Sequence, residues 1–235
     1  MKKYLTSLAL VALSAGSVVW GQQQWRRSQF ITNTYLANPA VAGTEPGTVL
    51  SSSYRQQWAG FDGAPTTKLL SGHQAVPGGG GVGFVLYNDD MGGAIKQTGI
   101  ELTGAYSVLL SNQDAVSFGL SMRGNQFVFD GTGLNVWQTG DQSLPQTIES
   151  TFGVDFNAGM MVYGKNYYFG MSVYKLLEDK LNLSGVDDDA NRMFRHYNFM
   201  ASYLYKVTQL FSLQPSALMR MTCLLYTSDA ADDTR

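Results

Sequence analysis

The residues that could carry chemistry are few and scattered along the chain. Asp187, Asp188 and Asp189 are three consecutive carboxylates that could bind Ca²⁺ through oxygen ligands, but no EF-hand spacing surrounds them. A solvated loop explains these carboxylates as well. The two histidines, His73 and His196, have no Cys or His at ligand spacing, so we expect no metal site.

Enzymatic motifs are equally weak. Gly78, Gly80 and Gly83 fit the G-x-G-x-x-G pattern of dinucleotide-binding folds, in which the glycines join a strand to a helix. The residues from Val82 to Tyr87 have the pattern of a strand instead. The sequence contains no G-x-S-x-G nucleophile motif, and spacing alone brings no Ser, His and carboxylate together. We therefore expect neither an enzyme nor a cofactor.

The composition favours a β-rich chain. Of its 235 residues, 12% are aromatic and only 14% are charged, whereas about 25% charged residues are usual in soluble proteins. The net charge of −2 lacks the basic surplus of a nucleic-acid-binding protein. The single cysteine, Cys223, cannot form an internal disulfide.

The N-terminal region predicts export. Residues 1–21 have the features of a cleavable signal peptide, with Lys2 and Lys3 before an apolar run from Leu5 to Val19. The alternative is a membrane anchor, but this run is shorter than the roughly 20 apolar residues of a spanning helix. Residues 22–47 are polar with scattered aromatics, and we expect a periplasmic segment that leads into the first strand.

Alternation with a period of two dominates residues 48–222. Leu102 and Tyr106 share one face of a strand while Glu101 and Thr103 share the other, so that one face is apolar and one polar. The run from Tyr35 to Val76 is interpreted as one β-hairpin. In all, the pattern predicts nine strands, over residues 48–58, 66–76, 82–87, 98–108, 116–125, 154–162, 167–173, 197–207 and 211–219.

The connections between these strands also have a pattern. The second, fourth, sixth and eighth are short turns, whereas the third, fifth and seventh are longer and more polar. Outer-membrane barrels have short periplasmic turns and longer extracellular loops, and their tilted strands need about ten residues to cross the bilayer. The sequence therefore predicts an all-β, antiparallel transmembrane outer-membrane β-barrel.

The strand count and the end of the chain predict an incomplete barrel. Nine strands is an odd number, whereas bacterial single-chain barrels close with an even number. Residues 223–235, CLLYTSDAADDTR, lose the alternation and are interpreted as an artefactual tail, or alternatively as a disordered one.

The face of a strand on which a polar residue lies, and the position of an aromatic residue at a strand end, predict the roles of these side chains. Arg substitutions at the lumen-facing Thr103 and Ser121 should be tolerated. Aromatic residues at strand ends favour an interfacial girdle over a carbohydrate- or peptide-binding face; they are Trp58, Tyr87, Tyr163 and Tyr167. Charged residues predicted to line the lumen could select a solute, or pair with one another across the interior; they are Arg55, Glu101, Arg123, Asp155, Lys206 and Arg220.

Three short segments carry a resemblance to a known family. NPAVAG, YRQQW and GFDGAPTT, in this order and spacing, resemble the opening of the PorP/SprF family of the type IX secretion and gliding machinery of Bacteroidetes. YNDDMGG and RHYNFMASYLYK extend the resemblance over roughly residues 29–221. We expect a structural or interaction role for the matching residues, which are Asn38, Pro39, Gly43, Tyr54, Arg55, Gln57, Trp58, Gly60, Asp62, Gly63 and Pro65.

The resemblance implies a function without catalysis. A family member is expected in the outer membrane, where it supports the export or surface attachment of secreted proteins. The implied partners are membrane lipid, other subunits of the secretion or gliding machinery, and secreted cargo or adhesins, but not nucleic acid. One alternative is a porin or hydrophobic-solute channel, and a less favoured one is a soluble, secreted β-sandwich binding module.

Overall fold

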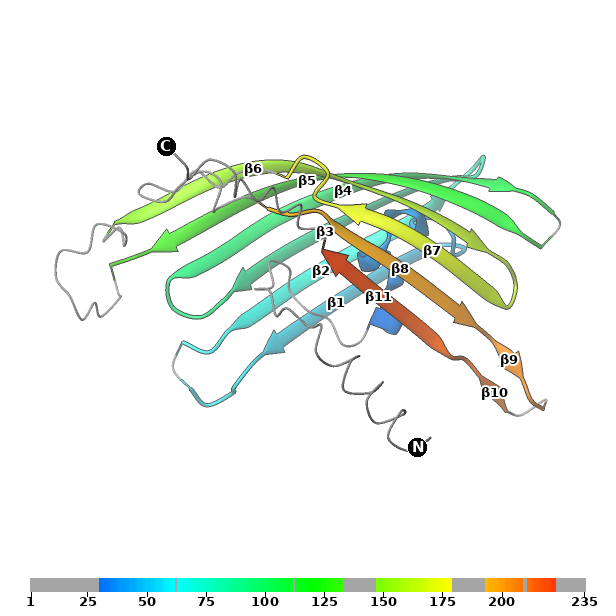
Figure 1. The fold of residues 1–235 in the computed structure, drawn as a ribbon, viewed down its shortest axis with the longest axis horizontal. Coiled ribbons are helices and arrows are strands. Elements are labelled where there is room, and N and C mark those ends of the chain that lie inside the picture. The colour runs from blue at the N-terminus through cyan, green and yellow to red at the C-terminus, as the bar shows by residue number, and fades with distance from the viewer. Residues whose placement is uncertain are drawn as a thin grey trace, which may run out of the picture.

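A single antiparallel sheet dominates the computed structural model, which describes residues 30–61, 63–111, 113–132, 147–178, 193–208 and 211–222. Nine strands follow one another in chain order, with β11 beside β8 at one edge (Figure 1). Their bounds are β1 (Thr48–Gln56), β2 (Thr66–Val76), β3 (Gly80–Asp90), β4 (Ile95–Leu109), β5 (Ala115–Asp130), β6 (Ile148–Tyr163), β7 (Tyr167–Tyr174), β8 (His196–Tyr203) and β11 (Ser216–Thr222). A separate two-stranded ribbon is formed by β9 (Tyr205–Lys206) and β10 (Ser212–Leu213).

The sheet is strongly curled into an open half-barrel (Figure 1). Within the described residues, β1 pairs only with β2, and β11 pairs only with β8. The predicted all-β antiparallel architecture with nine strands is therefore confirmed, and the described sheet does not close. Among these residues, no helix is long and apolar enough to cross a membrane.

The two faces of the sheet differ as the alternation predicts. On the convex face, Leu102 and Phe118 are 56% and 52% exposed, although both are large and apolar. On the concave face, the neighbouring Thr103 and Ser121 are buried. This arrangement inverts that of a soluble protein, and it is the arrangement of a barrel wall that faces lipid.

The apolar part of the convex face has the height of a bilayer core. Each residue of β4 lies in one row with its register partners on the other strands, and we call such a row a level. On the convex face of the described strands, the levels from Ile100 to Val108 contain no charged side chain. We call these levels the charge-free band. Nine residues at about 3.4 Å each, on a strand tilted by about 40°, span roughly 23 Å along the barrel axis, close to the ~25 Å band of outer-membrane barrels.

The third connection is short, so the prediction of a long polar loop there is wrong. β3 ends at Asp90 and β4 begins at Ile95. The polar residues assigned to the loop continue the ladder instead, because Asn88 pairs with Thr98 and Asp90 with Lys96. Much of the fifth and seventh connections lies outside the described residues.

The N-terminal described residues lie on the concave face (Figure 1). They form three 3₁₀ turns, η1 (Phe30–Thr32), η2 (Thr34–Ala37) and η3 (Pro39–Val41), and η3 contacts β4, β5 and β6. We call residues 35–43 the plug. Tyr35 and Ala40 within it are 2% and 0% exposed, so the plug is part of the core and not part of the opening hairpin, which begins only at β1.

Candidate functional site

The plug crosses the strands along a line of small residues. Cross-strand register places Gly81, Ala105, Gly119, Gly159 and Ser172 side by side from β3 to β7. We call this line the seat. The plug runs along the seat from its first residues over β7 and β8 to its last residues over β3.

Steric contact explains the three glycines of the seat. A Cβ atom on Gly119 would overlap the backbone of Pro39, and one on Gly159 would overlap the side chain of Asn38. At the far end, Gly43 has φ of +77°, and a Cβ there would lie 2.6 Å from Cα of Gly81. A larger residue at any of these three glycines would therefore push the plug away from the sheet.

Asn38 joins the plug to two strands. Its side-chain Nδ2 donates to the backbone carbonyls of Met160 on β6 and Met171 on β7, at 3.0 and 3.2 Å. Its Oδ1 accepts a hydrogen bond of 2.9 Å from the backbone N–H of Ala40, which caps η3. Because a side-chain amide supplies two donors and an acceptor, this one buried residue satisfies three backbone groups.

The beginning of the plug is held by β7 and β8. The carbonyl oxygen of Ala37 accepts hydrogen bonds from Oγ of Ser172 at 2.6 Å and from Nδ2 of Asn198 at 3.3 Å. The hydroxyl of Tyr174 donates to the carbonyl of Leu36 at 3.2 Å. The polar side chains of the concave face therefore bind plug backbone.

Tyr35 extends these contacts to β4 and β5. Its hydroxyl lies 2.7 Å from Oγ1 of Thr103, which lies 2.9 Å from Oγ of Ser121. Its ring lies 5.1 Å from that of His73, and burial raises the pKa of Tyr35, so the hydroxyl stays neutral. The predicted tolerance for Arg at Thr103 and Ser121 is therefore wrong, because both positions are buried in this network.

A row of charges lies beside the seat. Glu101, Arg123 and Asp155 are adjacent in register on β4, β5 and β6, and all three are buried. Nε of Arg123 donates to Oε2 of Glu101 at 2.8 Å. The guanidinium carbon also lies 5.7 and 5.5 Å from the ring centroids of Tyr87 and Tyr174. The prediction that these charged groups pair is confirmed for Glu101 and Arg123, although they lie on adjacent strands and not across the interior.

Asp155 and Lys175 add two further buried charges next to this ion pair. A carboxylate oxygen of Asp155 accepts hydrogen bonds from two backbone N–H groups at 2.7 and 3.0 Å. Lys175, directly after β7, is 5% exposed. Burial, and secondly the charge of Arg123, lower the pKa of Lys175 to about 8, while Asp155 opposes this shift. With Glu101, the cluster holds two acidic and two basic groups.

Other residues predicted to line the lumen are not buried. Arg55 and Arg220 occupy concave-face register positions, but they lie on β1 and β11 and are exposed. The open edges of the described sheet explain this, since no further described strand covers them. Lys206 lies in β9, outside the nine-stranded sheet, so its predicted place in the lumen is wrong.

The predicted aromatic girdle is wrong for two of its four members. Tyr87 is 3% exposed on the concave face, and its hydroxyl donates to Asn125 and accepts from Gln97 at 3.3 Å. Tyr163 packs against the buried core. Trp58 and Tyr167 are exposed, at 72% and 39%. The alternation of β3 could have placed Tyr87 on the concave face, because Tyr87 lies on the same face as the polar Asp89, which is also buried.

The residues that carry the family resemblance form two groups rather than one site. Asn38, Pro39 and Gly43 belong to the plug, and Asp62 lies outside the described residues. The others lie at the end of β1 and in the β1–β2 turn, and they are Tyr54, Arg55, Gln57, Trp58, Gly60, Gly63 and Pro65. This turn packs beside the β3–β4 turn around a groove of about 480 Å³.

The weaker motifs do not converge on a site. Gly80 and Gly83, two of the three G-x-G-x-x-G glycines, lie within β3, which continues as a strand. The carboxylates at 187–189 lie outside the described residues. Within the part of the chain that the structure describes, no group of three or more His, Cys, Asp or Glu side chains could hold a metal ion.

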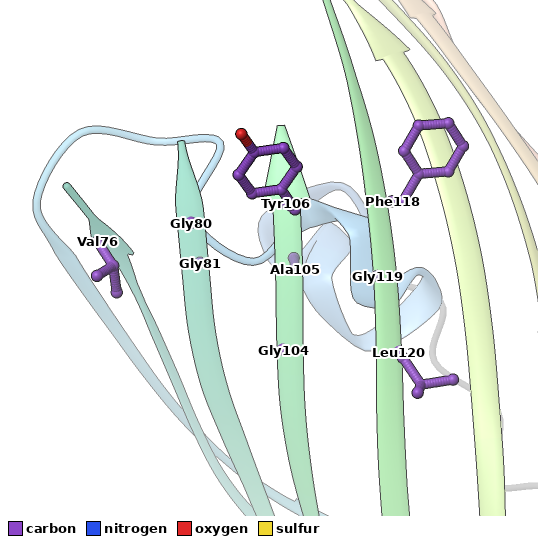
Figure 2. A pocket seen from close by; sticks show the side chains of 9 residues that line it. All are labelled: Val76, Gly80, Gly81, Gly104, Ala105, Tyr106, Phe118, Gly119 and Leu120. Atoms are coloured by element: carbon purple, nitrogen blue, oxygen red, sulfur yellow. The ribbon is translucent and has the colours of Figure 1, made fainter. Parts of the chain in front are cut away.

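The wall behind the seat is only one backbone thick. A groove of about 430 Å³ lies on the convex face, and its lining includes the seat residues Gly81, Ala105 and Gly119. Figure 2 shows the side chains of Tyr106 and Phe118 beside this groove, with the plug behind the strands. The seat glycines therefore bring the plug close to the convex side of the wall.

A family model matches most of the chain. The family model described as "Type IX secretion system membrane protein PorP/SprF" matches residues 19–223. This range includes the plug, the seat and all described strands. No curated protein and no solved structure matches the chain.

Proposed function

Because the chain belongs to the PorP/SprF family of type IX secretion system membrane proteins, we propose that it supports the export or surface attachment of secreted proteins without catalysis. In this proposal a cleavable signal peptide directs it to the outer membrane, where it binds other secretion or gliding subunits and secreted cargo or adhesins. The plug on the concave face is the observation that favours binding of other proteins over conduction of solutes through the barrel.

Contacts with the plug, together with an ion pair between strands, use the groups that a conducting lumen would offer to solutes. Ser172 and Asn198 bind the backbone of Ala37, Thr103 binds Tyr35, and Arg123 binds Glu101. A water-filled pore instead needs a polar lining that is free to exchange with solute. These contacts leave the ends of the strands and their connections as the surfaces for partner proteins.

Affinity purification of the tagged, full chain from native membranes tests this proposal. We expect secreted proteins or other machinery subunits to co-purify, and we expect planar bilayers containing the chain to show no steady ion conductance. A double variant, Trp58→Ser with Phe61→Ser, removes two exposed apolar side chains from the β1–β2 turn. Leu109→Ser with Leu110→Ser is the matched control, since these leucines are as exposed at the opposite end of the sheet.

Loss of co-purification in only one of the two double variants would assign the partner to that end of the barrel. Steady conductance together with an absence of co-purifying proteins would overturn the proposal. That result would favour the alternative, a porin or hydrophobic-solute channel. The polar concave face, including the row of Glu101, Arg123 and Asp155, is the observation in favour of this second candidate.

A further inference from the structure

A second and larger groove lies on the convex face, away from the seat. It has a volume of about 770 Å³ and crosses β1 to β6. Leu70, Leu86 and Ile100 line its apolar part and are 40–46% exposed. Gly124 is next to Ile100 in register, and the ring of Phe152 lies against it and forms the far wall.

The groove has a polar end at a defined height. Lys68, Asn88, Thr98 and Gln126 are neighbours in register across β2 to β5 and line this end. Nδ2 of Asn88 donates to Oγ1 of Thr98 at 2.8 Å. This row is the first beyond the charge-free band. The groove therefore begins at the level expected for the membrane interface and continues into the hydrocarbon level.

Lys68 brings an uncompensated positive charge to the polar end. Among the described residues, no carboxylate lies within salt-bridge distance of it, since the nearby Asp90 pairs with Lys96 at 3.7 Å. The register neighbours of Lys68, Tyr54 and Asn88, are uncharged. A cation at the interface attracts an anionic headgroup, and the apolar floor below it suits a hydrocarbon chain.

We propose that this groove binds one membrane lipid that has an anionic phosphate headgroup. The phosphate pairs with Lys68, and one acyl chain lies along Leu70, Leu86 and Ile100. The order of polarity along the groove, from cation to polar row to apolar floor, matches the order within such a lipid. This site does not depend on the role in secretion, because it requires only that the convex face meets the bilayer.

Native mass spectrometry of the delipidated full chain in detergent tests the site. The probes are phosphatidylglycerol, which is anionic, and phosphatidylcholine, which has no net charge. We expect one phosphatidylglycerol to be retained, with an affinity about fivefold higher than that for phosphatidylcholine. Lys68→Ala should abolish this preference, whereas Lys68→Arg should keep it because the charge remains.

A pair of glycine variants tests the place of binding. Gly124→Leu adds a side chain that pushes the ring of Phe152 into the groove, and it should abolish retention of both lipids. Gly104→Leu is the control, because Gly104 lies on the same convex face but outside this groove, and an added Cβ would meet nothing within 4 Å. Equal retention of the two lipids by the unmodified chain, an unchanged preference in Lys68→Ala, or equal behaviour of the two glycine variants would overturn the proposal.

Discussion

The convex and concave faces of the same sheet are stabilised in opposite ways. On the convex face, apolar side chains such as Leu102 and Phe118 are exposed, and the open position at Gly104 has free space around it. On the concave face, polar side chains are buried, and Gly119 lies against the backbone of the plug. The difference shows that the tightly packed core of this protein is its polar side.

In a polar core, a single substitution lowers the free energy of unfolding mainly through the partner that it leaves unpaired. Removing one partner of a buried hydrogen bond or ion pair leaves the other partner buried without compensation. On the convex face, by contrast, side chains such as Leu102 are exposed, so a substitution there leaves no buried partner behind. The four predictions below compare the two faces, beginning with the largest expected effect.

The concave ion pair should show the largest effect. Arg123→Met leaves Glu101 buried without its partner and should lower the free energy of unfolding by about 3–5 kcal/mol. The double variant Arg123→Met with Glu101→Leu removes both charges and should recover most of this loss. Denaturant unfolding in detergent measures both values. Equal destabilisation in the single and double variants would mean that the pair is not the source of the effect.

On the convex face, depth in the membrane should decide the cost of a charge. Leu102→Arg places a charge within the charge-free band and should cost about 2–4 kcal/mol in lipid bilayers. Ser150→Arg, on the same face but beyond this band, should cost about 1 kcal/mol or less. Unfolding titrations in vesicles provide the comparison. Similar costs at the two positions would contradict the assignment of the band to the bilayer core.

The two classes of glycine should respond differently to the same substitution. Gly119→Leu drives a side chain into the plug backbone and should cost about 1–3 kcal/mol, whereas Gly104→Leu should cost much less. Displacement of the plug would expose Tyr35 and Leu36, so chymotrypsin should cut there only in the Gly119 variant. Protection of these bonds in both variants would show that the seat tolerates a side chain.

The last prediction concerns the pH dependence of stability, whose effect is small for each pH unit. The pKa of Lys175 is about 8 in the folded protein and 10.5 ordinarily, so between these values the unfolded chain binds more protons. Its contribution to the free energy of unfolding should therefore rise with pH from 8 to 10.5, by at most about 1.4 kcal/mol per pH unit, and stay constant below this window. Lys175→Met should remove this rise in unfolding titrations, and an unchanged slope would exclude Lys175 as its cause.

The sequence by itself determined the strands and their two faces. Period-two alternation is a local property, so it located the start of β1 at Thr48 and both ends of β2, Thr66 and Val76, without tertiary information. The same parity correctly separated Glu101 and Arg123 from Leu102 and Met122. It failed at the third connection because the polar residues Asn88 and Asp90 continue the ladder beyond the apolar band.

Only the tertiary structure decided what fills the concave side. Asn38 binds carbonyls on β6 and β7 that lie 122 and 133 residues further along the chain, a separation that no local pattern records. Thr103 and Ser121 have the alternation of residues that face water, yet they lie in the network beneath Tyr35. The physical reason is that the alternation of a strand shows only that one face is polar. Water and the backbone of a plug can both form hydrogen bonds with that face, so the pattern does not distinguish between them.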